Sequence, residues 1–224
     1  MKTGILRMLM FSLTVVLAVS VTAEVRLPNI YDDGMVLQRD VPIRIRGWAE
    51  PGEEVAVRLD RRAPVTAVAS AEGTWRVTLG PLPAGGPHTL TVKGRNRIEL
   101  RDVLAGEVWL CSGQSNMQMA LQQVKDSQRE ISAADYPGIR LFHVDRTTAQ
   151  TPQDDVPGSW AACRPETARE FSATAYFFGR HLHGELDVPV GLIHSSWGGT
   201  RIEPWTPPCG YADVPELAEL RKQG

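Results

Sequence analysis

Ser115 stands where a serine could act as a nucleophile. In "VWLCSGQSNMQM" (108–119), an apolar run leads into a small, amide-rich stretch, and a helix-compatible segment, 118–124, follows. A serine at such a strand-to-helix turn is exposed, and the start of a helix favours a nearby negative charge. Its backbone N–H could then bind the oxyanion of an acyl-transfer reaction. Gln114 and Asn116 offer further amide donors beside it.

A second motif, "SSWGGTRIEPW" (195–205), follows another apolar run. The glycines Gly198 and Gly199 would let a backbone N–H approach an oxyanion that a side chain would block. In an open α/β sheet, ligands bind beyond the carboxyl ends of the strands. If both strands are parallel, Ser115 and one of these glycines together form an oxyanion hole. Taken separately, a serine after glycine is usually a helix cap and a glycine pair is usually a turn.

Two further residues follow the glycine pair. A carboxylate at Glu203 could orient a base or bind a hydroxyl of a substrate, and the indole of Trp205 could stack on a substrate ring. The alternatives are a loop ion pair with Arg201 and a packed tryptophan.

The elements that must position these motifs fall into two patterns. Residues 24–102 alternate between apolar and polar side chains in short runs separated by turn residues, which predicts a small antiparallel β-sandwich, an accessory domain. Residues 103–224 alternate buried strands with helices, which predicts an α/β domain with helices on both faces of a parallel sheet. The strands are expected at 41–49, 53–60, 73–80, 87–94, 96–103, 107–113, 139–144 and 188–195, and a helix at 172–186.

The N-terminus has the pattern of an export signal. Residues 1–23 carry Lys2 and Arg7, no acid, and an apolar run too short to span a bilayer, with Val21 and Ala23 placed for cleavage before Glu24. We therefore expect a periplasmic or extracellular protein without stable membrane insertion; a membrane anchor is the alternative. The net charge of −2 argues against a nucleic-acid partner.

The cysteines do not predict a metal site. Cys111, Cys163 and Cys209 are three, which allows one disulfide and one free thiol, and the sequence does not choose the pair. Cys111 lies in an apolar run and is expected to be a buried small hydrophobe. No Cys/His spacing is typical of zinc.

The stretches "GEVWLCSGQSNMQM" (106–119) and "VPVGLIHSSWGGTRIEPWTP" (188–207) together resemble the sialate O-acetylesterase family of SGNH hydrolases. "LPNIYDDGMVLQRDVPIRIRGWAEPGEEVAV" (27–57) is similar to the family's opening β-domain. The resemblance implies a flavodoxin-like three-layer SGNH domain and an esterase that removes acetyl groups from sugars with no metal or cofactor. It also implies Ser115 as nucleophile and oxyanion donor, and Gly198-Gly199 as the source of the second donor.

A general base for Ser115 is missing from this sequence. The family places a histidine, usually preceded by an aspartate, far downstream, together with a Gln-Gly-Glu block. The sequence has no such block, and none of its histidines has an acid three positions earlier. His194 lies just before the glycines, but within a strand. The others are His88, His143, His181 and His183.

The sequence therefore predicts the N-terminal portion of an exported carbohydrate O-acetylesterase, inactive or nearly so by itself. Its partner is an acetylated sugar or glycan. One alternative is an esterase of the same superfamily that acts on acetyl-xylan or another polysaccharide. The other is a non-catalytic glycan-binding or surface protein that keeps the esterase scaffold.

Overall fold

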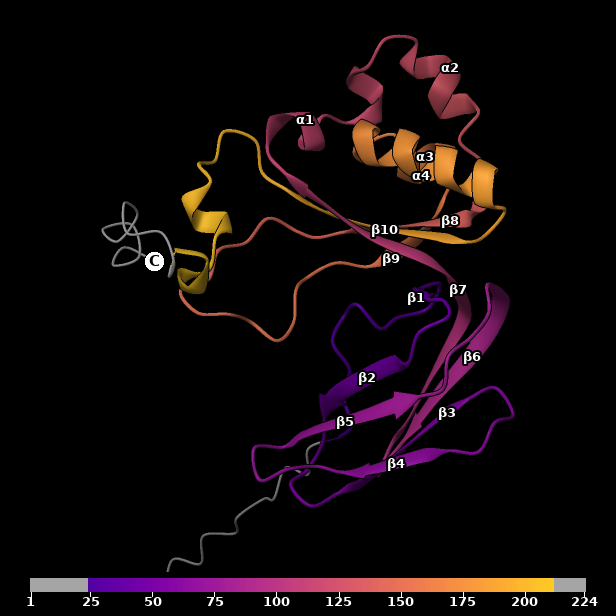
Figure 1. The fold of residues 1–224 in the computed structure, drawn as a ribbon, viewed down its shortest axis with the longest axis vertical. Helices are drawn as coiled ribbons and strands as arrows, with labels where there is room; N and C mark the ends of the chain where they lie inside the picture. The colour runs from indigo at the N-terminus through magenta and orange to yellow at the C-terminus, as the bar shows by residue number, and fades with distance from the viewer. Residues whose placement is uncertain (1–23, 212–224) are drawn as a thin grey trace, which may run out of the picture.

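A computed structural model describes residues 24–211 of the chain; the predicted signal peptide, residues 1–23, lies outside them. The described residues form a mixed sheet of eight strands and a separate pair of strands, with the helices gathered at one end (Figure 1). The strands are β1 (Val36–Gln38), β2 (Ile43–Trp48), β3 (Glu54–Leu59), β4 (Val65–Val68), β5 (Thr74–Leu79), β6 (Gly85–Lys93), β7 (Arg97–Gly113), β8 (Tyr136–His143), β9 (Trp160–Cys163) and β10 (Val190–Ser196). The helices are α1 (Ser115–Gln118), α2 (Ser127–Ser132), α3 (Pro165–Ala168) and α4 (Ala173–Leu186), and the 3₁₀ turns are η1 (Leu121–Gln123), η2 (Glu203–Trp205) and η3 (Pro208–Tyr211).

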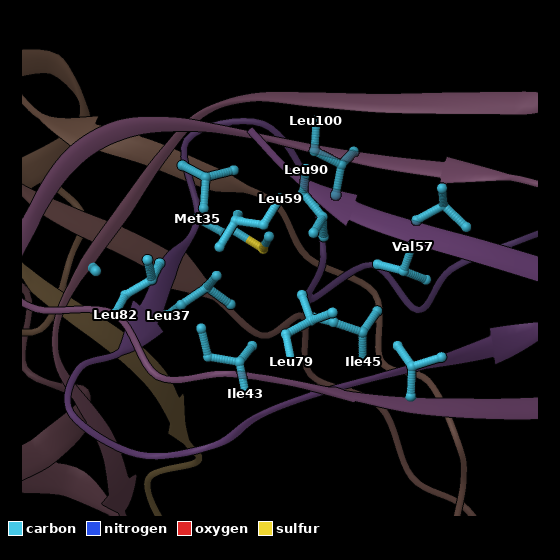
Figure 2. Close-up of a cluster of buried hydrophobic side chains, with 14 of the residues drawn as sticks. Met35, Leu37, Ile43, Ile45, Val57, Leu59, Leu79, Leu82, Leu90 and Leu100 are labelled. Carbon is cyan, nitrogen blue, oxygen red and sulfur yellow. The ribbon is translucent and has the colours of Figure 1, made fainter. Parts of the chain in front are cut away.

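The first half of the chain alternates as predicted. In β5, Trp75, Val77 and Leu79 are buried while the residues between them are exposed. β2 and β5 form an antiparallel pair that packs against the antiparallel ladder β4-β3-β6-β7. Burying one large aliphatic side chain contributes about 1.5–3 kcal/mol, so the shared cluster stabilises both sheets. Figure 2 shows its members pointing toward one another, among them Met35, Leu37, Ile43, Ile45, Val57, Leu59, Leu79, Leu82, Leu90 and Leu100.

The long strand β7 joins the two halves of the molecule. The strands predicted at 96–103 and 107–113 are one strand of 17 residues. Its first part pairs antiparallel with β6 and its last part pairs parallel with β10. Asp102 takes the left-handed conformation, φ 55°, within it. The boundary predicted between residues 102 and 103 falls inside this strand, and the division into two domains stays a prediction.

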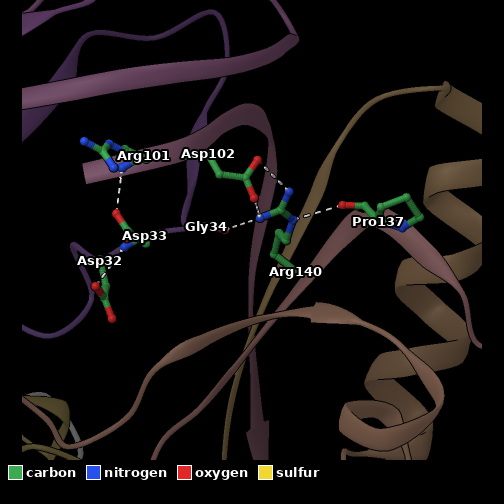
Figure 3. A network of polar contacts seen from close by, with 7 residues as sticks. All are labelled: Asp32, Asp33, Gly34, Arg101, Asp102, Pro137 and Arg140. Carbon is green, nitrogen blue, oxygen red and sulfur yellow. Dashed lines mark hydrogen bonds and ion pairs between the residues drawn. The ribbon is translucent and has the colours of Figure 1, made fainter. Parts of the chain in front are cut away.

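The side chain of Arg140 fastens β8 to this strand. Its buried guanidinium donates to both carboxylate oxygens of Asp102, at 2.6 and 3.1 Å (Figure 3). It also donates to the carbonyl oxygens of Gly34, at 3.3 Å, and Pro137, at 2.9 Å. A buried charge is costly unless it is paired and hydrogen-bonded. These bonds therefore hold the segment before β1 against β7 and β8.

The second half is built on the parallel strands β7, β10 and β8, as predicted. One face of these strands packs against the helices through a second cluster, which includes Ile139, Leu141 and Leu192. Its helices lie together on that side (Figure 1).

The opposite face differs from the prediction that helices cover both sides. Phe142 and Trp160 on that face belong to the cluster that contains Met35, and the Trp160 indole N–H donates to the Ile30 carbonyl at 2.8 Å. Within residues 24–211, the chain around β1 therefore takes the place of a second helical layer. The three-layer SGNH arrangement is not formed by the described residues.

The helix expected over 118–124 is wrong in its extent. α1 ends at Gln118, and Met119 turns to an extended conformation. Ala120 then bridges to Ser172, and the N–H of Leu121 donates to the carbonyl of Phe171 at 2.9 Å. Pairing with the segment before α4 therefore overrides the local helix preference.

The helix expected at 172–186 is confirmed as α4. Ser172 caps its start by accepting from the N–H of Ala175, and Asp187, with φ 51°, ends it. Gly184 lies within the last turn of this helix, two residues before its end at Leu186. The apolar spacing of Ala175, Phe178, Leu182 and Leu186 predicts the buried face of this helix only in part. Ala175 is buried and Leu182 packs against the core, but Phe178 and Leu186 are exposed, and Tyr176 is buried as well. Between residues 24 and 211, no helix has the length and apolarity that a membrane crossing requires.

Changing Asp102 to Asn should destabilise the protein. Asparagine tolerates the left-handed backbone of residue 102 but leaves the buried Arg140 guanidinium with a neutral partner. We expect the free energy of unfolding to fall by about 1–3 kcal/mol, measured by urea denaturation.

Asp40→Asn is the matched control. Asp40 also has a left-handed backbone, with φ 59°, but its ion pair with Arg39 lies at the protein surface, whereas the guanidinium of Arg140 is buried. Asp40→Asn should lower the free energy of unfolding less than Asp102→Asn does. Equal losses in the two variants would contradict a stabilising role for the Arg140–Asp102 pair.

Candidate active site

The two motifs predicted from the sequence meet at the same edge of the sheet. β7 and β10 pair in parallel with Ser112 opposite Ser195 and Gly113 opposite Ser196. The N–H of Trp197 then donates to the carbonyl oxygen of Gly113 at 3.0 Å, so the pairing continues to the last residue before each turn. The expected juxtaposition of the Ser115 turn and the glycine turn is confirmed.

The Ser115 turn is tight and held from outside. Gly113 has a φ of 147°, which favours glycine, and α1 begins two residues later. The Thr174 hydroxyl donates to the Asn116 carbonyl at 3.0 Å, and the Ala173 N–H donates to the Met119 carbonyl at 2.8 Å. The start of α4 therefore fixes the position of a helix only four residues long. So short a helix offers its terminal N–H groups but little macrodipole.

Ser115 is exposed, as predicted, and its polar groups both face Gln114. The hydroxyl donates to Gln114 Oε1 at 2.8 Å, and the backbone N–H of Ser115 donates to the same oxygen at 3.2 Å. An amide oxygen thus accepts from the N–H expected to bind an oxyanion. Gln114 is therefore in contact with the Ser115 hydroxyl, whereas the exposed Asn116 side chain forms no hydrogen bond to any residue in 24–211.

Gly198 lies directly against Ser115. A Cβ placed on Gly198 would come within 3.4 Å of Ser115 Oγ and 2.9 Å of Gln118 Oε1. The N–H of Gly198 donates to Gln118 Oε1, the counterpart of the Gln114 contact. Gln118 is a site residue that the sequence analysis missed, and it could have been found as the residue one helical turn after Gln114. Gly199, with φ 80°, is exposed, and a Cβ added there would meet nothing within 4 Å.

A cleft of about 370 Å³ lies beside the glycine turn. Trp197, Pro204 and Trp205 line it from the segment after β10, and Thr147 to Ala149 line it from the loop after β8. The Trp205 indole N–H donates to Thr200 Oγ1 at 2.8 Å, and that hydroxyl donates to the Trp197 carbonyl at 2.7 Å. Trp205 is thus held at the cleft wall, and half-buried Glu203 begins the same 3₁₀ turn.

None of the five histidines, all within residues 24–211, forms a hydrogen bond with Ser115, whose N–H and hydroxyl both bond Gln114. The buried His194 places Nε2 2.6 Å from Ser196 Oγ, and its ring stands edge-on to that of His143 with centroids 4.9 Å apart. His183 bonds the Val188 carbonyl through Nδ1 at 2.7 Å, and His88 pairs with Asp60 at 2.7 Å. His181 is exposed on α4. The interpretation of His194 as a buried polar residue in a strand is confirmed.

The three cysteines form no disulfide within residues 24–211, and the two buried ones are held as neutral thiols. Cys111 and Cys163 are buried free thiols and Cys209 is exposed, so residues 24–211 contain no disulfide. Burial raises the pKa of Cys111 to about 11 and that of Cys163 to about 12, which keeps both as thiols. Cys111 is the buried small hydrophobe that the sequence predicts. The described residues include no group of three or more His, Cys, Asp or Glu side chains that could hold a metal ion.

Comparison with known proteins places this site in context. No protein-family model matches the chain. It is 37% identical to the sialate O-acetylesterases of Pongo abelii, over 81% of the chain and 38% of the relative, and of Mus musculus, over 88% and 42%. A carbohydrate acetylesterase from Xanthomonas citri has a similar structure, with a TM-score of 0.81 and 39% identity over 85% of this chain and 44% of that one.

These matches confirm the resemblance to the sialate O-acetylesterase family, and the fold is that of an α/β esterase. The chain spans about two fifths of the length of the curated relatives it matches.

The burial of His194 predicts a pH-dependent stability. Burial first, then the charge of His143, lowers the pKa of His194 from 6.5 to about 4. Between these values the unfolded state binds a proton that the folded state does not, so stability falls as the pH falls. The loss from pH 6.5 to 4 should reach about 3 kcal/mol for this residue.

Urea denaturation of wild type and His194→Gln at pH 7 and pH 4.5 measures this effect. The pH dependence should shrink in His194→Gln and remain in His181→Gln, which changes an exposed histidine of α4. The same pH dependence in His194→Gln as in wild type would contradict the assignment.

Proposed function

We propose that this chain is part of a carbohydrate O-acetylesterase of the sialate O-acetylesterase type, with Ser115 as its nucleophile. The contact between Gly198 and Ser115 carries the proposal, because a glycine brings its backbone N–H close to an exposed hydroxyl without a side chain of its own in the way. The relatives named as sialate O-acetylesterases and the acetylesterase from Xanthomonas citri support the same reaction class.

In the proposed reaction, Ser115 Oγ attacks the carbonyl carbon of an acetyl ester and gives its proton to a general base. The carbonyl oxygen becomes an oxyanion, bound by the N–H groups of Ser115 and Gly198 in place of the amide oxygens of Gln114 and Gln118. Each such donor is typically worth about 3 kcal/mol in the barrier. The protonated base then gives its proton to the sugar oxygen as the bond to the carbonyl carbon breaks, and the sugar leaves as an alcohol. Water, deprotonated by the same base, attacks the acetyl-serine, and acetate leaves as Ser115 Oγ takes back the proton.

The general base has no candidate among the five histidines of the sequence. His194 is buried, its lowered pKa keeps it neutral at pH 7, and its Nε2 bonds Ser196 Oγ, whereas the Ser115 hydroxyl bonds Gln114. We therefore propose that the base is supplied from outside these 224 residues, a proposal supported by the larger size of the relatives, of which the chain spans about two fifths. On this proposal, the 224 residues alone hydrolyse esters several powers of ten more slowly than a complete enzyme.

The cleft beside the glycine turn is the proposed site of the sugar. Its walls combine the indoles of Trp197 and Trp205 with threonine hydroxyls, which suits a ring with apolar faces and polar edges. These walls suit sialic acid and xylan equally well. Comparing the rates of hydrolysis of acetylated sialic acid and of acetyl-xylan therefore tests which sugar is the substrate.

Hydrolysis of a chromogenic acetate ester by the full-length protein tests the mechanism. Ser115→Ala should lower kcat/KM by about 10⁴-fold or more, because it removes the nucleophile. Gly198→Ala should lower it by about 10²-fold, because the added methyl would crowd Ser115 Oγ at 3.4 Å and displace Gln118.

Gly184→Ala is the control for the glycine change. Gly184 lies in α4, and a Cβ there would meet nothing within 4 Å, so activity and folding should stay at the wild-type level. A Ser115→Ala protein as active as wild type would remove Ser115 from the mechanism. Absence of activity in a folded wild-type protein would favour a non-catalytic glycan-binding scaffold.

We also propose export with removal of residues 1–23, on the pattern of that segment alone. N-terminal sequencing of protein recovered from the periplasm or medium of its native host should begin at Glu24. A mature protein that begins at Met1 would contradict this proposal.

A further inference from the structure

The β-rich half contains a second cleft, of about 420 Å³, far from the Ser115 turn. We call it the cationic cleft. β2 and β5, which contribute most of its wall, lie at the end of the molecule opposite α1 (Figure 1). Its principal lining residues are Arg46, Trp48, Val68, Thr74, Arg76 and Asp154.

The cationic cleft carries two arginines in an unfavourable arrangement. Arg46 and Arg76 are directly opposite each other in the antiparallel register of β2 and β5, and both are exposed. Like charges in this position destabilise a strand pair. Arg46 is neutralised by the Asp154 carboxylate at 2.8 Å, but Arg76 forms no ion pair within residues 24–211. One guanidinium therefore faces the cleft with its charge unbalanced.

A second feature of the cationic cleft also does not serve stability. Trp75 lines it as well, and its buried indole N–H has no hydrogen-bond partner within the described part of the chain. A buried donor without a partner costs about 1–3 kcal/mol. The Trp75 indole lies on the buried face of β5 and Arg76 on the exposed face, so of these two features only the unbalanced charge of Arg76 is open to the cleft, and it indicates a surface shaped for a ligand.

The remaining walls define the chemistry of that ligand. Trp48 is half-buried, with the Arg26 guanidinium 5.4 Å from its ring centroid, and Val68 is 63% exposed. Thr74 and Ser70 add hydroxyls, 3.0 Å apart. A guanidinium presents paired donors that match a carboxylate, and the volume is that of a small-molecule site.

We propose that the cationic cleft binds a carboxylate-bearing sugar, with the carboxylate at Arg76 and the ring against Trp48 and Val68. This site is separate from Ser115 and does not depend on the proposed esterase reaction. It gives the β-rich half a glycan-binding role of its own.

Calorimetric titration of the full-length protein with glucuronic acid and N-acetylneuraminic acid tests the proposal, with galactose and inorganic phosphate as comparison probes. Arg76→Gln should raise the Kd for both sugar acids by about tenfold or more, because a hydrogen bond to a charged group is lost. It should also raise the unfolding midpoint without ligand, because the repulsion from Arg46 is removed. Galactose should bind more weakly than either acid.

Arg44→Gln is the matched control. Arg44 is exposed on the same face of β2 but does not line the cleft, so it should leave both the Kd and the midpoint near wild type. Hydrolysis of the chromogenic ester should be unchanged by Arg76→Gln, which separates this proposal from the one on Ser115. No binding of the sugar acids, equal loss in the two variants, or phosphate binding as tight as the sugar acids would overturn it.

Discussion

The parallel register of β7 and β10 is the constraint on which the candidate site depends. Both strands end together. Their pairing extends up to the two turns, because the Trp197 N–H donates to the Gly113 carbonyl. Glycine is needed where this pairing begins, because a Cβ on Gly106 would lie 1.9 Å from the Pro189 carbonyl oxygen. A slip of one residue in either strand would turn that strand's side chains, with Cys111 in β7 or His194 in β10, to the wrong face and would separate Ser115 from Gly198.

Much of this arrangement could be predicted from the sequence because its signals are local. Apolar runs that end in "SGQSN" and "SSWGG" predict two strands and two turns, and the general rule for open sheets predicts that the turns meet. Gln118 escaped prediction because its role depends on a contact across the sheet edge, with Gly198. The early end of α1 escaped it for a similar reason, since the bridge from Ala120 to Ser172 joins segments 52 residues apart.

The continuity of β7 shows why the domain boundary is harder to predict than the elements. Asp102 reads as a turn residue in the sequence, and its left-handed backbone does interrupt the alternation of the strand. The chain nevertheless continues as a strand, because the Asp102 side chain pairs with Arg140 of β8 and the residues that follow enter the sheet. Burial of Phe142 and Trp160 against the segment before β1 then joins the two halves into one cluster. Contacts between segments far apart in the sequence decide whether the chain divides into two domains at Asp102, and the local sequence pattern does not show these contacts.

The loop between β8 and β9 extends this coupling to the two clefts. Thr147 to Ala149 line the cleft beside the glycine turn, and Asp154 lines the cationic cleft. Arg46 holds Asp154 through both its carboxylate and its carbonyl, and Asn29 bonds the next residue, Asp155. One wall of the cleft beside Ser115 is therefore formed by a loop whose far end is fastened to the β-rich half. The position of that wall depends on ion pairs and hydrogen bonds made by residues that precede β7, so the β-rich half helps to shape the candidate active site even though it supplies none of its reacting groups.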